Sequence, residues 1–382
     1  MLAHSKKVFK DFFESEKSGG LTLIFFTVIS LILTNSSFQH DYLAIWEKSF
    51  AGMSLEHWIN DALMAIFFLL IGLELKREFQ IGELSSIKKA ALPLVSAAGG
   101  MLVPALIYLL FNYNQPTSNG FGIPMATDIA FALGILSLLG NRVPLSLKIF
   151  LTALAVIDDL GAIMVIALFY TKTIIWLNLL ASLGLFGLLL LFNKLKIKSL
   201  LVYIPVGIVM WYFMHHSGIH ATITGVLLAF AIPTKPSKKL ASPAEITQRF
   251  LHYPVPFLIL PLFALANTAI IIDDNWLESL SFPASQGIAF GLIIGKPLGI
   301  LLFTWLAVQI KIAEKPTGVT WNQLLGVGAL GGIGFTMSIF VTLLAFDSSL
   351  VINHGKFAIL ISSLIAGLIG FIWLSFSLKT KK

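Results

Sequence analysis

Two adjacent aspartates, Asp158 and Asp159, occupy the middle of the apolar stretch ALAVIDDLGAIMVIAL, residues 153–168. Neighbouring side chains on an α-helix point about 100° apart, so the two carboxylates must face different surroundings. Carboxylates buried close together resist double ionisation, and at least one is expected to hold a proton near neutral pH. Such a group can hold either a proton or a hard cation such as Na⁺, which is the physical basis of exchange. The alternative is a helix cap or a hydrogen-bonded core pair, but caps belong at helix ends and this pair lies mid-segment.

Three further polar residues lie within apolar segments and complete the candidate site. Thr127 and Asp128 follow the helix-breaking residues of SNGFGIPMATDIAFALGIL, and Lys296 lies in IIGKPLGI. A charge at mid-bilayer costs about 2.5–3.5 kcal/mol on insertion scales, so such residues are candidates for function. Asp128 can alternatively compensate the partial charge of a helix end. A buried lysine must pair or lose its proton, so Lys296 is expected to pair with Asp158 or Asp128, unless its stem reaches the interface.

Titratable residues also lie near the ends of other apolar segments. The motif GLELKRE places Glu74 and Glu78 one helical turn apart, next to Arg77, where the two like charges repel. This cluster suits a proton sensor or an entry funnel on the cytoplasmic side, or a solvated helix end. His220, in SGIHATITG, titrates in the useful range, and a hydrogen-bonded structural histidine is the alternative. Asp61 lies early in its segment, where a structural role is expected.

The composition of the chain identifies the environment of these residues. Its 382 residues are 57% hydrophobic and 12% charged, with a mean hydropathy of +0.89, whereas soluble proteins are about 25% charged. Apolar runs of about 18 or more residues recur, which is the length that crosses a bilayer as a helix. We therefore predict an all-α integral membrane protein. The chain has no cysteine, which excludes disulfides, thiol chemistry and cysteine-based metal sites.

About twelve transmembrane helices account for the apolar runs. They are residues 20–34, 57–76, 90–111, 121–139, 146–170, 174–192, 199–215, 218–232, 252–271, 284–309, 321–346 and 354–377. Of the 26 lysines and arginines, 22 fall in segments on one side, three on the other, and one, Lys296, within a span. The positive-inside rule then places both termini in the cytoplasm. The net charge of +7 is attributed to this topology rather than to nucleic-acid binding.

The loops between these spans are short, which predicts a single transmembrane domain over residues 1–382. Residues 1–19 have the pattern of a short amphipathic helix on the cytoplasmic membrane surface. The longest cytoplasmic loop is expected at residues 233–251, which are rich in proline, serine and lysine.

Two of the spans are interrupted by glycine and proline. Gly120, Gly122 and Pro124 precede the polar ATD of the fourth span, and five glycines interrupt residues 324–341 in the eleventh. Proline and glycine weaken a helix, and unwound backbone at membrane depth is tolerated where it is buried or lines a cavity. Two broken spans in corresponding positions indicate inverted repeats, here spans 3–5 and 10–12, with the site where spans 4 and 11 cross.

Six motifs together resemble the NhaA-type bacterial sodium/proton antiporters, a family whose members contain inverted repeats. They are GLELKRE, PMATDIAFALG, ALAVIDDLGAI, SGIHATI, GKPLGI and GIGFTMSIF, and the resemblance runs from the first span to the twelfth.

The resemblance implies a role for each residue of the candidate site. Na⁺ or Li⁺ would bind at Asp159, Asp158 and Thr127, with Asp159 as the main ligand and Asp158 as second proton carrier or gate. Asp128 would lie with Thr127 at the crossing of the broken spans. Lys296 would balance the crossing on the other side and exchange its partner Asp158 for a proton.

The same resemblance implies a set of residues for pH activation. They are Glu74, Arg77, Glu78, His220 and His252. The chain departs from the family's best-known members at two positions, where Gln248 and Arg249 replace an acidic residue and a histidine. The pH profile is therefore not fixed by the resemblance.

The residues and the resemblance together predict a transporter rather than an enzyme. It would reside in the bacterial inner membrane and expel Na⁺ or Li⁺ in exchange for a larger number of external protons. No nucleotide, cofactor or nucleic-acid partner is expected, since there is no Walker motif. A homodimer is a further expectation, with the external stretch 35–56 as its candidate contact, although that stretch has no decisive hairpin signal.

Two other functions remain as alternatives at this point. A sodium-coupled symporter on the same fold has little use for the mid-span Lys296. An intramembrane aspartyl protease needs a GxGD-type context, which neither MATDIA nor AVIDDLG provides.

Overall fold

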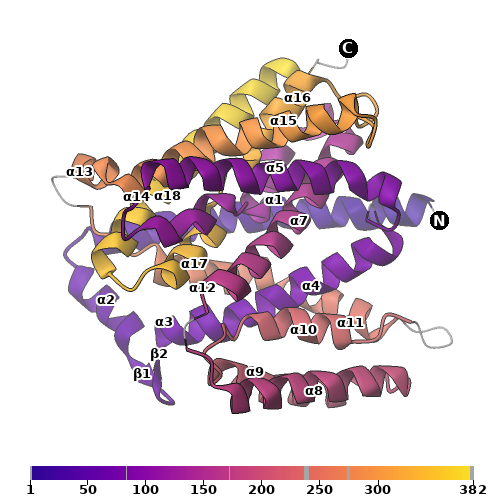
Figure 1. Ribbon diagram of the computed structural model, residues 1–382, viewed down its shortest axis with the longest axis vertical. Coiled ribbons are helices and arrows are strands. Elements are labelled where there is room, and N and C mark those ends of the chain that lie inside the picture. The colour runs from indigo at the N-terminus through magenta and orange to yellow at the C-terminus, as the bar shows by residue number, and fades with distance from the viewer. Residues whose placement is uncertain (1, 83, 172, 236–240, 273–275, 379–382) are drawn as a thin grey trace.

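A computed structural model describes residues 2–82, 84–171, 173–235, 241–272 and 276–378. Within these ranges the chain is almost entirely helical, and one two-stranded hairpin is the only sheet. Long helices run across the molecule, α7 passes through its centre, and α8 and α9 lie along its lower edge (Figure 1).

The elements of the first half of the chain follow the expected spans closely. They are α1 (Leu2–Thr34), α2 (Gln39–Glu47), β1 (Ser49–Phe50), β2 (Met53–Ser54), α3 (Leu55–Trp58), the π-helix η1 (Ile59–Leu63), α4 (Met64–Ile81), α5 (Ile87–Phe111), the 3₁₀-helix η2 (Ser118–Met125), α6 (Ile129–Leu138), the 3₁₀-helix η3 (Gly140–Arg142) and α7 (Leu145–Phe169).

The elements of the second half include two more π-helical segments. They are α8 (Trp176–Lys194), α9 (Leu200–His215), α10 (Ile223–Ala231), α11 (Pro243–Leu251), the π-helix η4 (Val255–Ile259), α12 (Leu260–Asn267), α13 (Trp276–Ser281), α14 (Pro283–Phe290), the π-helix η5 (Gly291–Gly295), α15 (Lys296–Gln309), α16 (Trp321–Gly331), α17 (Phe335–Ala345) and α18 (Ser349–Ser377).

The structure confirms a helical membrane protein, but the count of twelve spans stays a prediction. In the described part of the chain, eight helical segments are long and apolar enough to cross a membrane, or up to ten if each of two bent helix pairs is one span. The span expected at 218–232 contains α10, which has only nine residues. A span needs roughly 20 residues, so α10 does not cross a bilayer alone.

Two expected segments differ from the structure. Residues 1–19 do not form a separate short helix, because α1 is continuous from residue 2 to residue 34. The side chains of residues 2–17 lie outside the described part, so the amphipathic pattern stays a prediction. The expected loop at 233–251 is wrong in its second half, which is α11. Ser242 caps this helix by accepting a hydrogen bond from the backbone N–H of Glu245, and Pro243 begins it, which is a strong helix start.

The helices that surround the aspartates pack closely because small residues lie at their crossings. Gly99 of α5 faces Gly299 of α15, and a Cβ on either glycine would meet the carbonyl oxygen of the other. The central helix α7 contacts α4, α5, α6, α16 and η2. Interfaces of this kind allow membrane helices to approach through their backbones. Helices α5 and α15 are thus in backbone contact, and α7, with the aspartates on it, packs against α5 in the middle of the bundle.

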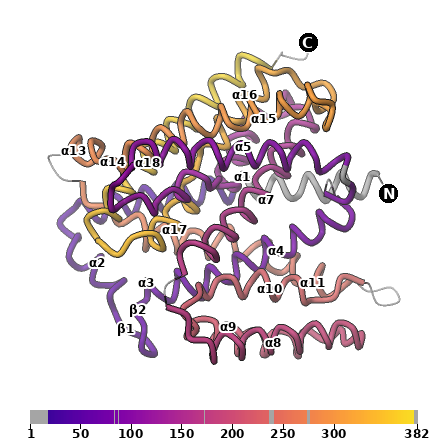
Figure 2. Tube along the Cα trace, viewed as in Figure 1, coloured from indigo at the N-terminus to yellow at the C-terminus, as the bar shows by residue number. Residues whose placement is uncertain are grey.

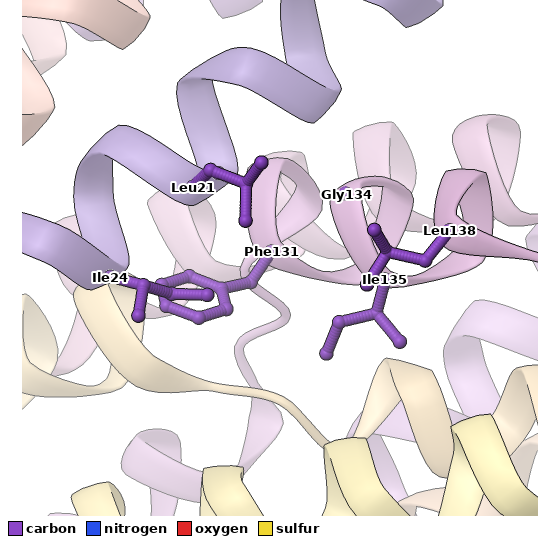
Figure 3. Close-up of a pocket in the computed structure, with 7 residues that line it drawn as sticks. Leu21, Ile24, Phe131, Gly134, Ile135 and Leu138 are labelled. Atoms are coloured by element: carbon purple, nitrogen blue, oxygen red, sulfur yellow. The ribbon is translucent and has the colours of Figure 1, made fainter.

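The first and sixth helices also meet through glycine. Gly20 of α1 lies against the Ala130 carbonyl oxygen and the Gly134 Cα of α6. Leu21, Ile24 and Phe131 surround a small apolar notch beside this contact (Figure 3). The notch has no charged lining and is separate from the aspartate site.

Strands β1 and β2 form an antiparallel hairpin within residues 35–56, with Ser49 opposite Ser54 and Phe50 opposite Met53. The turn residues Ala51 and Gly52 both have positive φ, at 50° and 87°. Turns of this kind usually contain Asn-Gly or Asp-Gly, so the Ala-Gly pair gives no sequence signal. The hairpin and α2 lie at the lower left of the molecule, far from the C-terminal end of α18 at the upper right (Figure 2).

Candidate functional site

The two broken spans cross each other at their unwound segments. The first is interrupted at residues 126–128, between η2 and α6, and the second at residues 332–334, between α16 and α17, where the helix axis bends by 46°. The backbone N–H of Asp128 donates to the carbonyl of Ile333 at 2.6 Å, and Ser338 Oγ donates to the carbonyl of Ile123 at 2.7 Å. Each broken span therefore satisfies backbone polar groups of the other at the crossing.

Asp128 joins the N-terminal ends of two half-helices. Its Oδ1 accepts the backbone N–H of Phe131 at 3.1 Å, which caps α6. Its Oδ2 accepts both the backbone N–H and the hydroxyl of Thr336, at 3.1 and 2.5 Å, in the first turn of α17. Helix N-termini carry partial positive charge, which a carboxylate stabilises. Both oxygens of Asp128 are thus engaged by the protein.

Asp158 is fully buried on α7 and is held through one oxygen only. Its Oδ2 lies 2.8 Å from Lys296 Nζ and accepts a hydrogen bond from Thr127 Oγ1 at 2.8 Å. Its Oδ1 has no hydrogen-bond partner within the described residues. Asp158 therefore belongs to a buried ion pair and still has one free acceptor atom.

Lys296 is paired with Asp158, which answers the question of its partner that the sequence left open. It is fully buried, directly after the π-helix η5. Its ammonium group also donates to the carbonyl oxygen of Met125, the last residue of η2. Helix C-termini carry partial negative charge, so Lys296 balances a C-terminal end at the crossing, while Asp128 balances the N-terminal ends.

Thr127 connects the ion pair to the second broken span. Its hydroxyl lies 2.8 Å from Asp158 Oδ2 and 2.9 Å from the carbonyl oxygen of Gly331, the last residue of α16. A hydroxyl has one hydrogen to donate. Thr127 can therefore donate to Asp158 or to Gly331, but not to both at once.

Asp159 differs from its neighbour in having no donor from the protein. It is fully buried, and neither carboxylate oxygen has a hydrogen-bond partner in the described part of the chain. The charged groups near enough to act on it are Asp158, Asp128, Lys296 and Glu74. A buried carboxylate without donors is costly unless a proton or a cation compensates its charge. The chemistry of this position fits a group that exchanges one for the other.

The residues of the GLELKRE motif lie at the end of α4, beside α11. The Gln248 side chain lies beside Glu74, and Arg77 Nη2 lies 3.5 Å from Glu78 Oε1. The charge of Arg77 also acts on His252. Glu74, Arg77, Glu78 and His252 are thus brought together, with Gln248 as an additional member.

Arg249 does not join this cluster. It pairs instead with Glu245, one turn earlier on α11, at 2.5 Å, and both side chains are exposed. Of the two positions that depart from the family pattern, only Gln248 faces Glu74.

His220 lies apart from the other candidates for pH activation. Its Nε2 is 3.0 Å from the carbonyl oxygen of Tyr170, at the end of α7. Tyr170 in turn donates its hydroxyl to the carbonyl of Asn119 and accepts the backbone N–H of Gly122, both in η2. His220 is therefore linked to the start of the first broken span rather than to Glu74.

Asp61 forms an ion pair that the sequence did not predict. Its Oδ2 lies 2.9 Å from Nδ1 of His215 at the end of α9, and both side chains are partly exposed, at 21% and 25%. Partly exposed pairs contribute about 0–1 kcal/mol. We expect Asp61→Asn to lower the free energy of unfolding by no more than this. A larger loss, measured by unfolding in detergent, would show that the pair contributes more than partly exposed pairs usually do.

Comparisons with known proteins show which family this chain belongs to. A family model described as Na⁺/H⁺ antiporter 1 matches residues 10–374. The chain belongs to this family. A relative from Flavobacterium psychrophilum, named Na⁺/H⁺ antiporter NhaA, is 62% identical over 97% of both chains. The NhaA of Cytophaga hutchinsonii is 56% identical over 98% of this chain and 96% of its own. The NhaA-type resemblance carried by the six motifs is therefore confirmed.

The fold also matches a solved antiporter structure. The sodium/proton antiporter MjNhaP1 from Methanocaldococcus jannaschii, solved at pH 8, covers 97% of this chain and 96% of its own with a TM-score of 0.53. The sequence identity is only 13%, so this match supports the antiporter fold and not the assignment of individual residues.

Several residues that build the site of this antiporter-family chain are not evident from the sequence. Thr336 and Ser338 bind across the crossing, and their only signal is their place after the glycines of GIGFTMS. The carbonyl groups of Met125, Gly331 and Ile333 also contribute. Backbone atoms have no sequence signal, so they could not be found before the structure.

Proposed function

We propose that the protein exchanges cytoplasmic Na⁺ or Li⁺ for a larger number of external protons, using Asp159 and Asp158 as a shared site. The observation that carries the proposal is that, among the described residues, neither oxygen of buried Asp159 has a hydrogen-bond partner, nor does Oδ1 of the adjacent Asp158. Oxygen atoms are the ligands that hard cations prefer. The names of the relatives, all sodium/proton antiporters, support exchange over symport or proteolysis.

The charges explain why one site can hold either ion. Lys296 and the ionised Asp158 cancel, so ionised Asp159 leaves one net negative charge in a buried position. Either a proton or Na⁺ neutralises it, and occupation by one excludes the other. The free oxygens of both aspartates and the Thr127 hydroxyl would serve as ligands of the cation.

Lys296 supplies the second exchanging proton. When a cation attracts the Asp158 carboxylate, Lys296 would lose the partner of its ion pair and release a proton. Release of one proton from Asp159 and one from the Lys296–Asp158 pair for each Na⁺ moves net charge. The membrane potential then drives transport, at about 2.3 kcal/mol per charge per 100 mV.

Asp128 has a different part in this mechanism. Its oxygens bind the first turns of α6 and α17, so it holds the crossing together and contributes to the field at Asp159. The half-helices that meet there can tilt against the rest of the bundle and expose the site to either side, as in other inverted-repeat transporters.

The remaining features of the whole protein follow from this function. Residues 1–382 would form one transport domain in the bacterial inner membrane, with both termini in the cytoplasm, as the distribution of lysine and arginine predicts. Strand β1 of the hairpin is exposed, with the Phe50 side chain 67% accessible, and we propose the hairpin as the contact of a homodimer.

The cluster at the end of α4 would set the pH at which transport begins. Glu74 lies near enough to Asp159 for their charges to interact, and the neutral Gln248 lies beside it. We expect Gln248→Glu to move the midpoint of pH activation upward by about 0.5–1 unit, because two adjacent carboxylates ionise less readily together. Arg249→His, on the exposed side of α11, is the matched control and should leave the midpoint in place. A native midpoint in Gln248→Glu would exclude Glu74 from the pH response.

Everted membrane vesicles test the proposed function. With an imposed pH gradient, added Na⁺ should dissipate the gradient, whereas K⁺ at equal concentration should not. If Na⁺ has no effect on the gradient at any pH, the protein does not exchange Na⁺ for protons. If Na⁺ adds to proton movement in the same direction, a symporter is the better description.

A further inference from the structure

The C-terminal end of α10 is closed by side chains from two other helices. Lys76 Nζ, from α4, donates to the carbonyl oxygens of Ala229, Phe230 and Ile232 at 3.3, 2.7 and 2.6 Å. The remaining carbonyl in this run, that of Ala231, accepts Asn193 Nδ2 of α8 at 2.7 Å. The last carbonyl groups of a helix have no hydrogen-bond partner within the helix. Those of residues 229–232 are bound by side chains of α4 and α8.

The ammonium group of Lys76 uses all its hydrogens in this contact. An ammonium group has three hydrogens to donate, and three carbonyl oxygens receive them. The side chain is buried, with 9% of its surface exposed, although it lies between the charged residues of GLELKRE. Its charge faces the negative end of the α10 dipole. Lys76 therefore does not belong to the solvated face of the motif.

Lys76 and Glu74 point to opposite sides of α4. They are two residues apart, which corresponds to about 200° of rotation on an α-helix. Lys76 contacts α10, whereas Glu74 faces Gln248 of α11, acts on Asp159 of α7, and has Arg77 and Glu78 beside it on α4. The contact between Lys76 and α10 thus fixes the rotation of the last turns of α4, which decides where the Glu74 carboxylate lies.

The packing between the two helices supports the same conclusion. Gly225 of α10 lies against the backbone of Ala65 and Leu69, and Gly72 of α4 lies against Val226 and Ala229. The helices are in backbone contact at these glycines, and Lys76 adds a directional contact at the cytoplasmic end. Small-residue packing allows two helices to slide or rotate, whereas three hydrogen bonds to one ammonium group do not.

We propose that Lys76 is a positioning residue that locks the end of α4 onto α10 and so holds Glu74 toward α11 and the aspartate site. The inference rests on the proposed role of Glu74 in pH activation. It assigns Lys76 no contact with Na⁺.

The test compares Lys76→Met, Lys76→Gln and Lys76→Arg with Asn193→Ala, using the full chain in everted vesicles. Asn193→Ala removes the other side chain that caps α10 and leaves α4 untouched, so it controls for damage to α10 itself. Glu74→Gln is measured in parallel. The readouts are the pH midpoint and the apparent KM for Na⁺, at matched amounts of folded protein judged by size-exclusion chromatography.

We expect Lys76→Met and Lys76→Gln to shift the midpoint by about 0.5 unit or more and to raise the KM about threefold, because a displaced charge acts differently on the aspartates. Lys76→Arg should remain near the native midpoint, and Asn193→Ala should have the native midpoint even if its yield falls. A native midpoint and KM in the Lys76 variants would overturn the proposal. So would failure of both uncharged variants to fold while Asn193→Ala folds, since Lys76 would then be structural.

Glu74→Gln separates the two proposals. If it shifts the midpoint and the Lys76 variants do not, the role of Glu74 stands and the positioning role of Lys76 fails. If Glu74→Gln has the native midpoint, the proposed pH role of Glu74 fails, and a shift in the Lys76 variants alone would contradict positioning through Glu74.

Discussion

Asp159→Asn is expected to abolish the dissipation of a pH gradient by Na⁺, with a loss of about 100-fold or more in apparent affinity. Asparagine keeps the shape of the side chain but can neither titrate nor supply a negative charge to a cation. Removal of one charged partner in a buried site typically costs about 3 kcal/mol, which corresponds to two orders of magnitude in binding. The measurement is the response of everted vesicles to increasing Na⁺ at several pH values.

Asp61→Asn is the control for that experiment, because it removes an aspartate that pairs with His215 away from the crossing. It should respond to Na⁺ like the native protein. If Asp159→Asn also retains the native response, Asp159 is not the exchanging group.

Lys296→Met is expected to destabilise the protein more than any other substitution considered. It removes the partner of fully buried Asp158 and a donor to the carbonyl of Met125. Breaking a buried ion pair costs about 3–5 kcal/mol, since it leaves one buried charge uncompensated. We expect the temperature of half-unfolding in detergent to fall by about 5–10 °C.

The double variant Asp158→Asn/Lys296→Met separates the charge from the packing. With both charges removed, no buried carboxylate is left unpaired, and most of the lost stability should return. A double variant that is as unstable as Lys296→Met, or less stable, would show that the loss comes from packing or from the Met125 contact.

Much of the architecture could be predicted because membrane helices have strong local signals. Most of the predicted spans coincide with apolar helices within a few residues, and the glycines and proline of residues 120–124 and 326–334 marked both helix breaks. The adjacency of Asp158 and Asp159 was enough to predict that their surroundings differ, since helical geometry alone separates neighbouring side chains. The resemblance of the six motifs to the NhaA-type antiporters then predicted the exchange of Na⁺ for protons.

The pairing of charges could not be predicted, because it depends on contacts between residues far apart in the chain. Lys296 had two candidate partners, and only the tertiary structure distinguishes them: Asp158 is in the ion pair, while Asp128 is occupied by the starts of α6 and α17. The contact of Lys76 with α10 is of the same kind, since nothing in GLELKRE indicates the carbonyl groups of α10. The composition of residues 243–251 favours a loop and outweighs the helix start signal at Ser242 and Pro243, although the structure has α11 there.

The central claim is that Na⁺ and protons compete for the buried carboxyl groups of Asp159 and Asp158. Calorimetric titration of the purified protein with Na⁺, in buffers of different ionisation enthalpy, measures the protons released as Na⁺ binds. Competition predicts the release of about one to two protons per Na⁺, and no Na⁺ binding in Asp159→Asn. Binding of Na⁺ without proton release, or equal binding in Asp159→Asn, would contradict it.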